Sequence, residues 1–217
     1  MGRITSPGLS IAREALDWAV RSGATFEPDK TALVHFTRWR ERDAPETPID
    51  VGGHLIHPQE SVKILGVTMD QGLRYKKHIA RASYKGLETV LALKRLKNLS
   101  PRTARQLFQA TVVPRIDYAS SVWSHAGSEP KMKGMARVQR LGAQAITGAF
   151  RTVALPVLEA EASILPIKTR HELKAVKTWL KLKTVPARHP IHNIVLRPFR
   201  RTFPQQWHCA NKWHGSQ

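Results

Sequence analysis

The amino-acid sequence predicts an α+β fold: a small antiparallel sheet with one helix, then an all-helical region, then an extended tail. Two changes of pattern predict it. Up to about Asp70 the apolar residues form short strand-like runs between turn residues, and beyond it they recur every three to four residues, as in helices. From Thr184 onward, prolines break every periodic pattern. We therefore expect strands only within residues 31–70.

The N-terminal part begins with a predicted amphipathic helix. Leu9 and Leu16 lie on its apolar stripe, and Gly23 ends it, because glycine readily adopts the left-handed conformation that follows a helix. The Gly52-Gly53 pair is typical of a two-residue hairpin turn. Strands are expected at residues 32–37, 49–51, 54–56 and 61–69.

Cap residues mark the helices that follow. Ser100 is a predicted N-cap with Pro101 in the first turn, and this helix is expected to stop before Pro114, because proline lacks an amide donor. Thr169 and Glu172 form a capping box that predicts another helix start. Apolar stripes predict further helices at residues 85–97 and 132–148. Three tryptophans with apolar neighbours are expected in the core: Trp18, Trp123 and Trp179.

Positive charge is concentrated beyond residue 80. The sequence has 35 Lys/Arg and 16 Asp/Glu residues, a net charge of +19. Residues 1–80 hold 11 of the bases and 10 of the acids, and residues 81–217 hold the other 24 and 6. This asymmetry favours a polyanionic partner. Nucleic acid is expected, because Lys and Arg contacts release the counterions condensed on it.

The sequence shows no motif of a nucleotide- or metal-dependent enzyme. It lacks a Walker phosphate loop and the GxGxxG, HExxH and GxSxG patterns. Its aspartates are isolated, so none can pair to clamp two Mg²⁺ ions, and the tail residues lack the spacing of zinc ligands. We expect no metal, cofactor or small-molecule substrate for this chain. The residues concerned are Asp17, Asp29, Asp50, Asp70 and Asp117, and in the tail His189, His192, His208, Cys209 and His214.

The sequence does not indicate a membrane protein. The N-terminus lacks the apolar stretch of a signal peptide, and no apolar run approaches the ~20 residues of a membrane span. We expect a soluble intracellular protein, nuclear or cytoplasmic, without a membrane partner.

Five blocks of sequence carry a resemblance to a known family. In their order they resemble the reverse transcriptases of non-LTR (LINE-type) retrotransposons, from the palm behind the catalytic Asp-Asp hairpin, through primer grip and thumb, to the connection. The match covers roughly residues 9–180. The blocks are Trp18 to Thr37, Ile56 to Ile79, Val113 to Trp123, Gln139 to Thr152 and Glu159 to Pro166.

The resemblance implies roles for individual residues. Lys30 occupies the place of the lysine that donates a proton to the leaving pyrophosphate. The run Lys63, Ile64, Leu65, Gly66 and Val67 matches the primer grip, which positions the 3′ end of the primer. A set of basic residues is expected to contact the backbone of the template–primer duplex from the thumb: Lys76, Lys77, Arg81, Lys85, Lys94, Arg95 and Lys97.

The resemblance also implies a domain organisation. It places the catalytic Asp-Asp hairpin before Met1 and any RNase H domain after Gln217, so we expect a truncated polymerase fragment that keeps its RNA/DNA duplex-binding surface. Mg²⁺ is expected only in the full-length polymerase. The expected segments are a palm remnant with a primer-grip-like hairpin (1–70), a helical thumb-like region (71–125), a helical connection (126–183) and a basic, proline-containing, poorly ordered tail (184–217).

Two other interpretations of the sequence stay open. A stand-alone basic nucleic-acid-binding or structural protein would show the same charge. A non-functional translation product is the other, because the first 70 residues are expected to leave a sheet edge uncovered, and such edges promote aggregation.

We predict that the isolated chain has no polymerase activity. Phosphoryl transfer in this family needs metal-bound aspartates that the resemblance places outside these 217 residues. The measurement is Mg²⁺-dependent nucleotide incorporation on a primed RNA template, and incorporation above a protein-free control would contradict the prediction.

Overall fold

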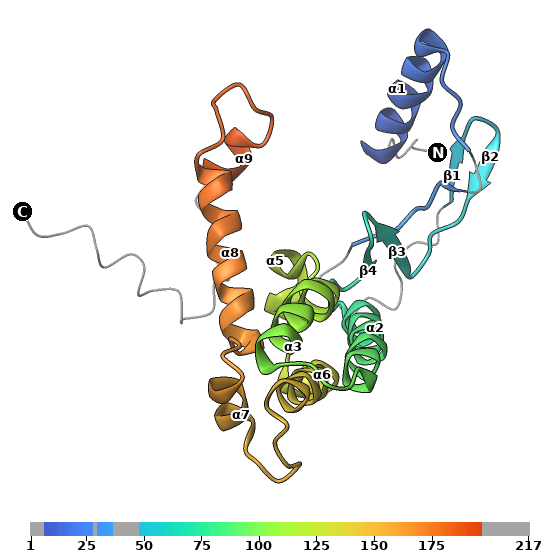
Figure 1. Cartoon of the computed structure of the whole chain (residues 1–217). Coiled ribbons are helices and arrows are strands. Elements are labelled where there is room, and N and C mark those ends of the chain that lie inside the picture. Colours follow the sequence, from blue (N-terminus) through green and yellow to red (C-terminus); the bar gives the residue numbers. More distant parts are fainter. Residues whose placement is uncertain (1–6, 28–29, 37–47, 197–217) are drawn as a thin grey trace, which may run out of the picture. The chain divides into compact units, whose positions relative to one another are not determined.

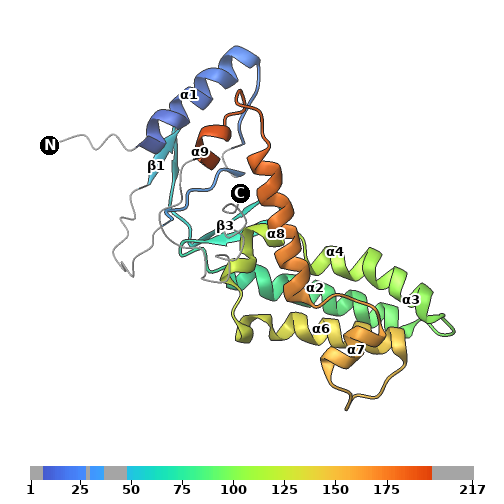
Figure 2. The ribbon, with the colours of Figure 1, turned by 90° about the vertical axis from the view of Figure 1, so that its left-hand side faces the viewer.

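The computed structural model describes residues 7–27, 30–36 and 48–196, and its elements confirm the α+β class. The chain divides into two compact units, of which the first ends at His171 and the second begins at Glu172. Figures 1 and 2 show the elements from two sides (Figure 1, Figure 2). They are α1 (Pro7–Ser22), β1 (Ile49–Val51), β2 (His54–Ile56), β3 (Ser61–Ile64), β4 (Val67–Asp70), α2 (Lys76–Arg95), α3 (Pro101–Leu107), the π-helical η2 (Phe108–Val112), α4 (Val113–Ile116), α5 (Ser120–Trp123), the 3₁₀ turn η3 (Ser124–Ala126), α6 (Glu129–Thr147), α7 (Leu155–Glu161), α8 (Ile167–Lys183) and α9 (His192–Leu196).

The strands form two separate antiparallel hairpins. The hairpin β1–β2 turns at Gly52-Gly53, as its sequence predicts, and the Asp50 carboxylate accepts a hydrogen bond from the Gly53 amide at 2.9 Å. The expected strand at residues 32–37 is not formed in its described part, where Leu33 makes only an isolated bridge with Pro58. Thr37 lies outside the described residues.

Residues 61–69, which the sequence predicts as one strand, are the second hairpin. Ser61 pairs with Asp70 and Ile64 with Val67, so the chain reverses at Leu65 and Gly66. Both residues have positive φ angles, 46° and 86°, which is the geometry of a tight hairpin turn. The run of apolar residues hides this turn, because Leu65 is not a residue type that favours positive φ.

Asp70 connects this hairpin to α2. Its carboxylate accepts hydrogen bonds from the amides of Tyr75 at 2.7 Å and Arg74 at 3.1 Å. Tyr75 has a left-handed backbone, with φ at 53°, and its ring is buried. These contacts fix the direction in which α2 leaves the hairpin.

Two hydrophobic cores form along α2, the larger against Val90 and Leu93 in its second half and the smaller against Ile79 and Ala82 in its first half. The larger joins α2 to α3, α4, α6 and α7, so the segments expected as thumb-like and connection regions share one core. The smaller joins β4 to α2, α5 and α6. Fully or almost fully buried side chains of the first are Val90, Phe108, Val112, Ile116, Val138 and Leu158, and of the second Val67, Ile79, Trp123 and Met135.

The helix that begins at Ser100 continues past Pro114, contrary to the sequence-based prediction. Its N-cap is as expected, since Ser100 accepts from the Thr103 amide at 3.2 Å. A π-helical turn, η2, then precedes α4, and the Val113 amide bonds to the carbonyl of Phe108 five residues earlier. The wider π turn accommodates the proline ring, which would otherwise clash with the preceding turn.

Three further expectations differ from the structure. Helix α8 begins at Ile167, so Thr169 lies inside it rather than at its N-cap. Trp123 is fully buried, but Trp18 and Trp179 are about half exposed, at 53% and 49%. The helix α9 lies within the segment expected to be extended, whose residues 197–217 are outside the described part. Among the described helices, none is both long and apolar enough to cross a membrane.

We predict that Gly86→Ala lowers the free energy of unfolding by about 1–3 kcal/mol, the usual cost of overpacking a core. A Cβ at Gly86 would overlap the Ile116 side chain, because α2 and α4 approach closely there. Helix propensity alone predicts the opposite sign, a gain of about 1 kcal/mol. Urea unfolding measures the effect, with Ala80→Gly, exposed on the same helix, as the control for propensity. A more stable Gly86→Ala chain would contradict the packing.

Candidate nucleic-acid interface

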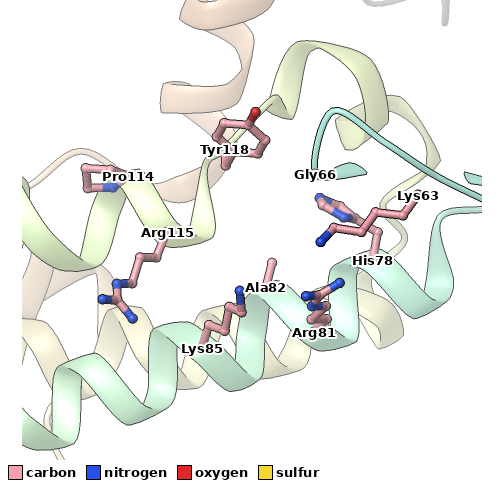
Figure 3. A pocket seen from close by; sticks show the side chains of 9 residues that line it. All are labelled: Lys63, Gly66, His78, Arg81, Ala82, Lys85, Pro114, Arg115 and Tyr118. Carbon is pink, nitrogen blue, oxygen red and sulfur yellow. The ribbon is translucent and has the colours of Figure 1, made fainter. Parts of the chain in front are cut away.

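A basic hollow of about 420 Å³ lies between hairpin β3–β4, α2 and α4 (Figure 3). It is open to solvent, and the described residues that line it include basic residues and no acidic residue. The lining residues are Lys63, Gly66, His78, Arg81, Ala82, Lys85, Pro114, Arg115 and Tyr118.

Four cations from three elements converge on this hollow. Lys63 comes from β3 and Arg115 from α4, and Arg81 and Lys85 lie four residues apart on one face of α2. Within the described residues, none of the four forms an ion pair. Lys77, one turn earlier on α2, differs in contacting the Glu60 carboxylate at 3.5 Å. The hollow is therefore a site of uncompensated positive charge.

Tyr118 holds the hairpin turn at the edge of the hollow. Its hydroxyl donates a hydrogen bond to the Leu65 carbonyl oxygen at 2.9 Å. A Cβ at Gly66 would lie 3.2 Å from the tyrosine ring, so glycine permits this approach as well as the positive φ. Residues 53 positions apart in the sequence thereby fix the place of the turn.

The four residues that follow Pro114 lie in four different environments. Arg115 lines the hollow, Ile116 is fully buried in the larger core, and Tyr118 contacts the hairpin. Asp117, between them, is buried and points toward Arg170 and His171 in a polar network. The direction of Asp117 therefore determines the directions of its neighbours.

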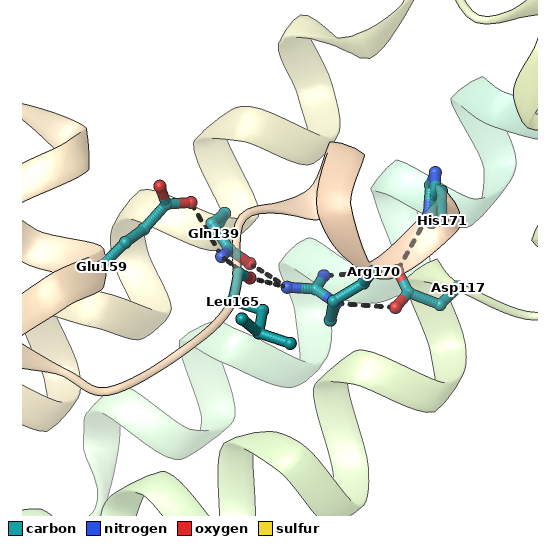
Figure 4. Close-up of polar contacts among 6 residues, drawn as sticks. All are labelled: Asp117, Gln139, Glu159, Leu165, Arg170 and His171. Carbon is teal, nitrogen blue, oxygen red and sulfur yellow. Dashed lines mark hydrogen bonds and ion pairs between the residues drawn. The ribbon is translucent and has the colours of Figure 1, made fainter. Parts of the chain in front are cut away.

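The polar network joins α4 to the start of α8 (Figure 4). Arg170 Nε donates to Asp117 Oδ2 at 2.8 Å, and His171 Nε2 lies 3.0 Å from Asp117 Oδ1. Arg170 also donates to Gln139 Oε1 at 3.1 Å and to the Leu165 carbonyl at 2.6 Å. The Gln139 amide in turn donates to Glu159 at 2.9 Å. Each polar group that the network buries thus has a partner.

The network holds Asp117 in its charged form. Burial by itself would raise the pKa of this carboxyl, but hydrogen bonds from His171 and Arg170, together with the charge of Arg170, outweigh burial and lower the pKa to about 2. The Asp117 side chain is fully buried and that of Arg170 is 11% exposed, so solvent screens the pair only weakly.

The structure brings together only part of the predicted site. Lys63 and Gly66 meet Arg81 and Lys85 at the hollow, while the Val67 side chain lies in the smaller core. A second group begins at Lys94, nine residues after Lys85, or about 14 Å along the helix axis. This group consists of Lys94, Arg95 and Lys97, and Lys76 and Lys77 lie at the other end of α2.

One predicted site residue lies away from the hollow, and three residues that line the hollow were not predicted. Lys30 is exposed in a turn, where its amide donates to the Glu27 carbonyl at 3.1 Å, and it does not line the hollow. Sequence reasoning missed His78, Arg115 and Tyr118. The signal for His78 was its position one helical turn before Arg81. The signal for Arg115 and Tyr118 was their position in the sequence block that follows Pro114.

The described residues contain no group of three or more His, Cys, Asp or Glu side chains that could hold a metal ion. His208, Cys209 and His214 of the tail are outside the described part of the chain. The roles assigned to the site residues from sequence stay predictions.

We predict that Asp117→Asn lowers the free energy of unfolding at pH 7 by about 3–5 kcal/mol, the usual cost of breaking a buried ion pair. Because the folded pKa of Asp117 lies below the usual value of 3.8, its ionisation stabilises the fold above about pH 4. That contribution, about 2 kcal/mol, is lost as the pH falls toward 2.

Urea unfolding of wild type and variant between pH 7 and pH 2 measures both effects. The difference between them should shrink by about 2 kcal/mol across the acid range. Asp17→Asn, an exposed control on α1, should stay within about 0.5 kcal/mol of wild type. A difference that does not vary with pH would place the ionised carboxylate outside the network.

Comparison with known proteins relates the chain to mobile elements. No protein-family model matches it, and no solved structure matches it. The chain is 24% identical over 169 residues to the 115 kDa protein in type-1 retrotransposable element R1DM of Drosophila melanogaster. The match covers 76% of this chain but only 16% of that protein, so the chain spans less than a fifth of the relative's length. The match supports a retrotransposon-related protein.

Proposed function

We propose that this chain is part of a non-LTR retrotransposon reverse transcriptase, in which hairpin β3–β4 and helix α2 hold the backbone of a template–primer duplex. The observation that carries the proposal is the convergence, on the hollow beside the Gly66 turn, of four cations that form no ion pair with any described residue. The relative in a retrotransposable element supports the ancestry, and the ordered blocks of sequence support the region of the polymerase.

The shape of the hairpin suits contact with a nucleic-acid strand. Gly66 has no side chain, and Leu65 and Gly66 are exposed at the turn, so a backbone can approach closely. Lys63 and Arg81 both lie between this turn and α2 in Figure 3. Phosphate groups are the partners that such lysines and arginines contact, and they release counterions as they do so.

The exposed face of α2 extends this surface beyond the hollow. Lys77, Arg81 and Lys85 recur every four residues and therefore lie on one face, and Lys94 and Arg95 continue the positive charge to the end of the helix. Glu88 is the one acidic residue within α2. A rigid helix of 20 residues, about 30 Å long, is long enough to follow a duplex over several phosphates.

The proposed contact has no sequence preference. Contacts to phosphates position a duplex but do not distinguish bases. The sequence contains no paired zinc ligands and no RNA-recognition aromatic motif that would read bases. We therefore infer weak binding to RNA–DNA hybrids or double-stranded RNA that depends strongly on salt.

We predict that Arg81→Ala/Lys85→Ala weakens binding to every duplex alike. Each lost phosphate contact should also reduce the slope of log affinity against log salt by about 0.9, the value for B-DNA. Lys94→Ala/Arg95→Ala should act in the same direction if the surface extends along α2. The measurement is a titration with several RNA–DNA hybrids at three salt concentrations.

The control removes two charges elsewhere, by Arg13→Ala/Arg21→Ala on α1, where both side chains are exposed. An unchanged slope in both α2 variants would place the contacts outside α2. Loss of binding to one sequence only would mean that bases are read.

A further inference from the structure

His78 is a buried histidine with one nitrogen unused. Only 5% of the residue is exposed, and its Nδ1 accepts a hydrogen bond from the Thr68 amide at 3.3 Å. A neutral imidazole that accepts at Nδ1 carries its proton on Nε2, which is therefore a donor. No group of the described residues accepts a hydrogen bond from this buried Nε2. Buried donors without partners are rare in native structures.

The surroundings of His78 fix the ring in place. Its centroid lies 5.6 Å from that of the buried Trp123, and the Thr68 amide holds Nδ1. Burial, and then the charge of Arg81, lower the pKa of His78, so the ring is neutral at pH 7. A neutral ring offers one N–H donor whose position does not depend on rotation of a flexible chain.

His78 also lines the basic hollow. Figure 3 shows its imidazole beneath the Gly66 turn, beside the ammonium of Lys63. The residue that carries the unused donor therefore forms part of the wall of a hollow that Lys63, Arg81 and Arg115 also line. Every charged group that the described residues contribute to this wall is positive, so the arrangement favours an anion over a cation.

We propose that this hollow is a discrete binding site for one phosphate group, with His78 Nε2–H as a hydrogen-bond donor and Lys63, Arg81, Lys85 and Arg115 as its cations. The inference rests on the proposed function for the source of the phosphate, an internal phosphodiester or a terminal phosphate of a nucleic-acid strand. A volume of about 420 Å³ leaves room for the adjoining sugar, and the open side admits a strand.

The site differs from an ordinary basic surface in one respect. Surface lysines attract phosphates without fixing where they lie, whereas a buried, immobile N–H donor favours one position. Phosphate binding at this position would give Nε2 the partner that it lacks. The proposal therefore concerns a single contact point within the duplex-binding surface, and it can fail while that surface still binds.

The experiment uses the full chain and two probes. Inorganic phosphate is titrated while NMR follows the Nε2–H signal of His78, assigned by its loss in His78→Gln. Then 16-base-pair RNA–DNA hybrids are titrated, with 5′-phosphate or 5′-hydroxyl ends. We expect phosphate to shift the His78 signal, and Lys63→Gln/Arg115→Gln to weaken phosphate binding by about tenfold or more, as for loss of charged hydrogen bonds.

Substitutions at His78 separate the donor from the ring. His78→Phe keeps an aromatic ring against Trp123 and removes the donor, and should weaken phosphate binding, while His78→Gln returns an amide donor and should restore part of it. Lys63→Gln/Arg115→Gln, at exposed positions, gives the same test if His78→Phe does not fold. The matched control is Arg13→Gln/Arg21→Gln on α1, which should bind phosphate as wild type does.

The outcomes distinguish this inference from the proposed function. An unmoved His78 signal, with Lys63→Gln/Arg115→Gln no weaker than the control, overturns the phosphate site, and salt-dependent hybrid binding would then still support the proposed function. A shifted signal without hybrid binding supports the phosphate site and overturns the proposed function. Equal affinity for both hybrids identifies an internal phosphodiester, and tighter binding of the 5′-phosphate form identifies a terminal phosphate.

Discussion

The buried ion pair between Asp117 and Arg170 is the contact on which the site depends. Asp117 lies at the end of α4, and its partners Arg170 and His171 are 53 and 54 residues away on α8. A fully buried carboxylate is unfavourable unless it is paired and hydrogen-bonded, and here both conditions hold. The network therefore allows one orientation of the α4 end, which sets Arg115 toward the hollow and Tyr118 toward the hairpin.

From this pair the constraints extend to the hairpin in short steps. The Tyr118 hydroxyl donates a hydrogen bond to the Leu65 carbonyl in the turn, and the Asp70 carboxylate accepts hydrogen bonds from the amides of Arg74 and Tyr75, just before α2. Thr68, in the same hairpin, donates to His78 of α2. The hairpin is thus tied to α2 through Asp70 and Thr68, and to the segment after α4 through Tyr118, so Lys63 and Arg81 face one space although neither contributes to the core. The rigid elements position the charges, and the charges themselves stay free to meet a ligand.

Local signals in the sequence predicted local structure well. Gly52-Gly53 defines its own turn, and Ser100 its own cap, because the deciding interactions lie within three residues. The turn at Leu65 escaped prediction because a tyrosine 53 residues away stabilises it. For the same reason Asp117 looks isolated in the sequence, since its partners are 53 and 54 residues away. The capping-box pattern at Thr169 was misleading, because the helix begins at Ile167. Of the site, family resemblance and charge indicated Lys63, Arg81 and Lys85, whereas the one local signal for His78 was its position one helical turn before Arg81.

The polar network and the basic hollow differ in how their charges are compensated. In the network, Asp117 and Gln139 are buried, and both are hydrogen-bonded to Arg170. In the hollow, four cations and one buried N–H donor lie around a space in which the described residues provide no acid. Close like charges repel one another, and an unused buried donor costs stability, so the hollow raises the energy of the free protein. A bound anion would relieve both costs at once, and for that reason the features that destabilise the free hollow are the ones that would hold a phosphate.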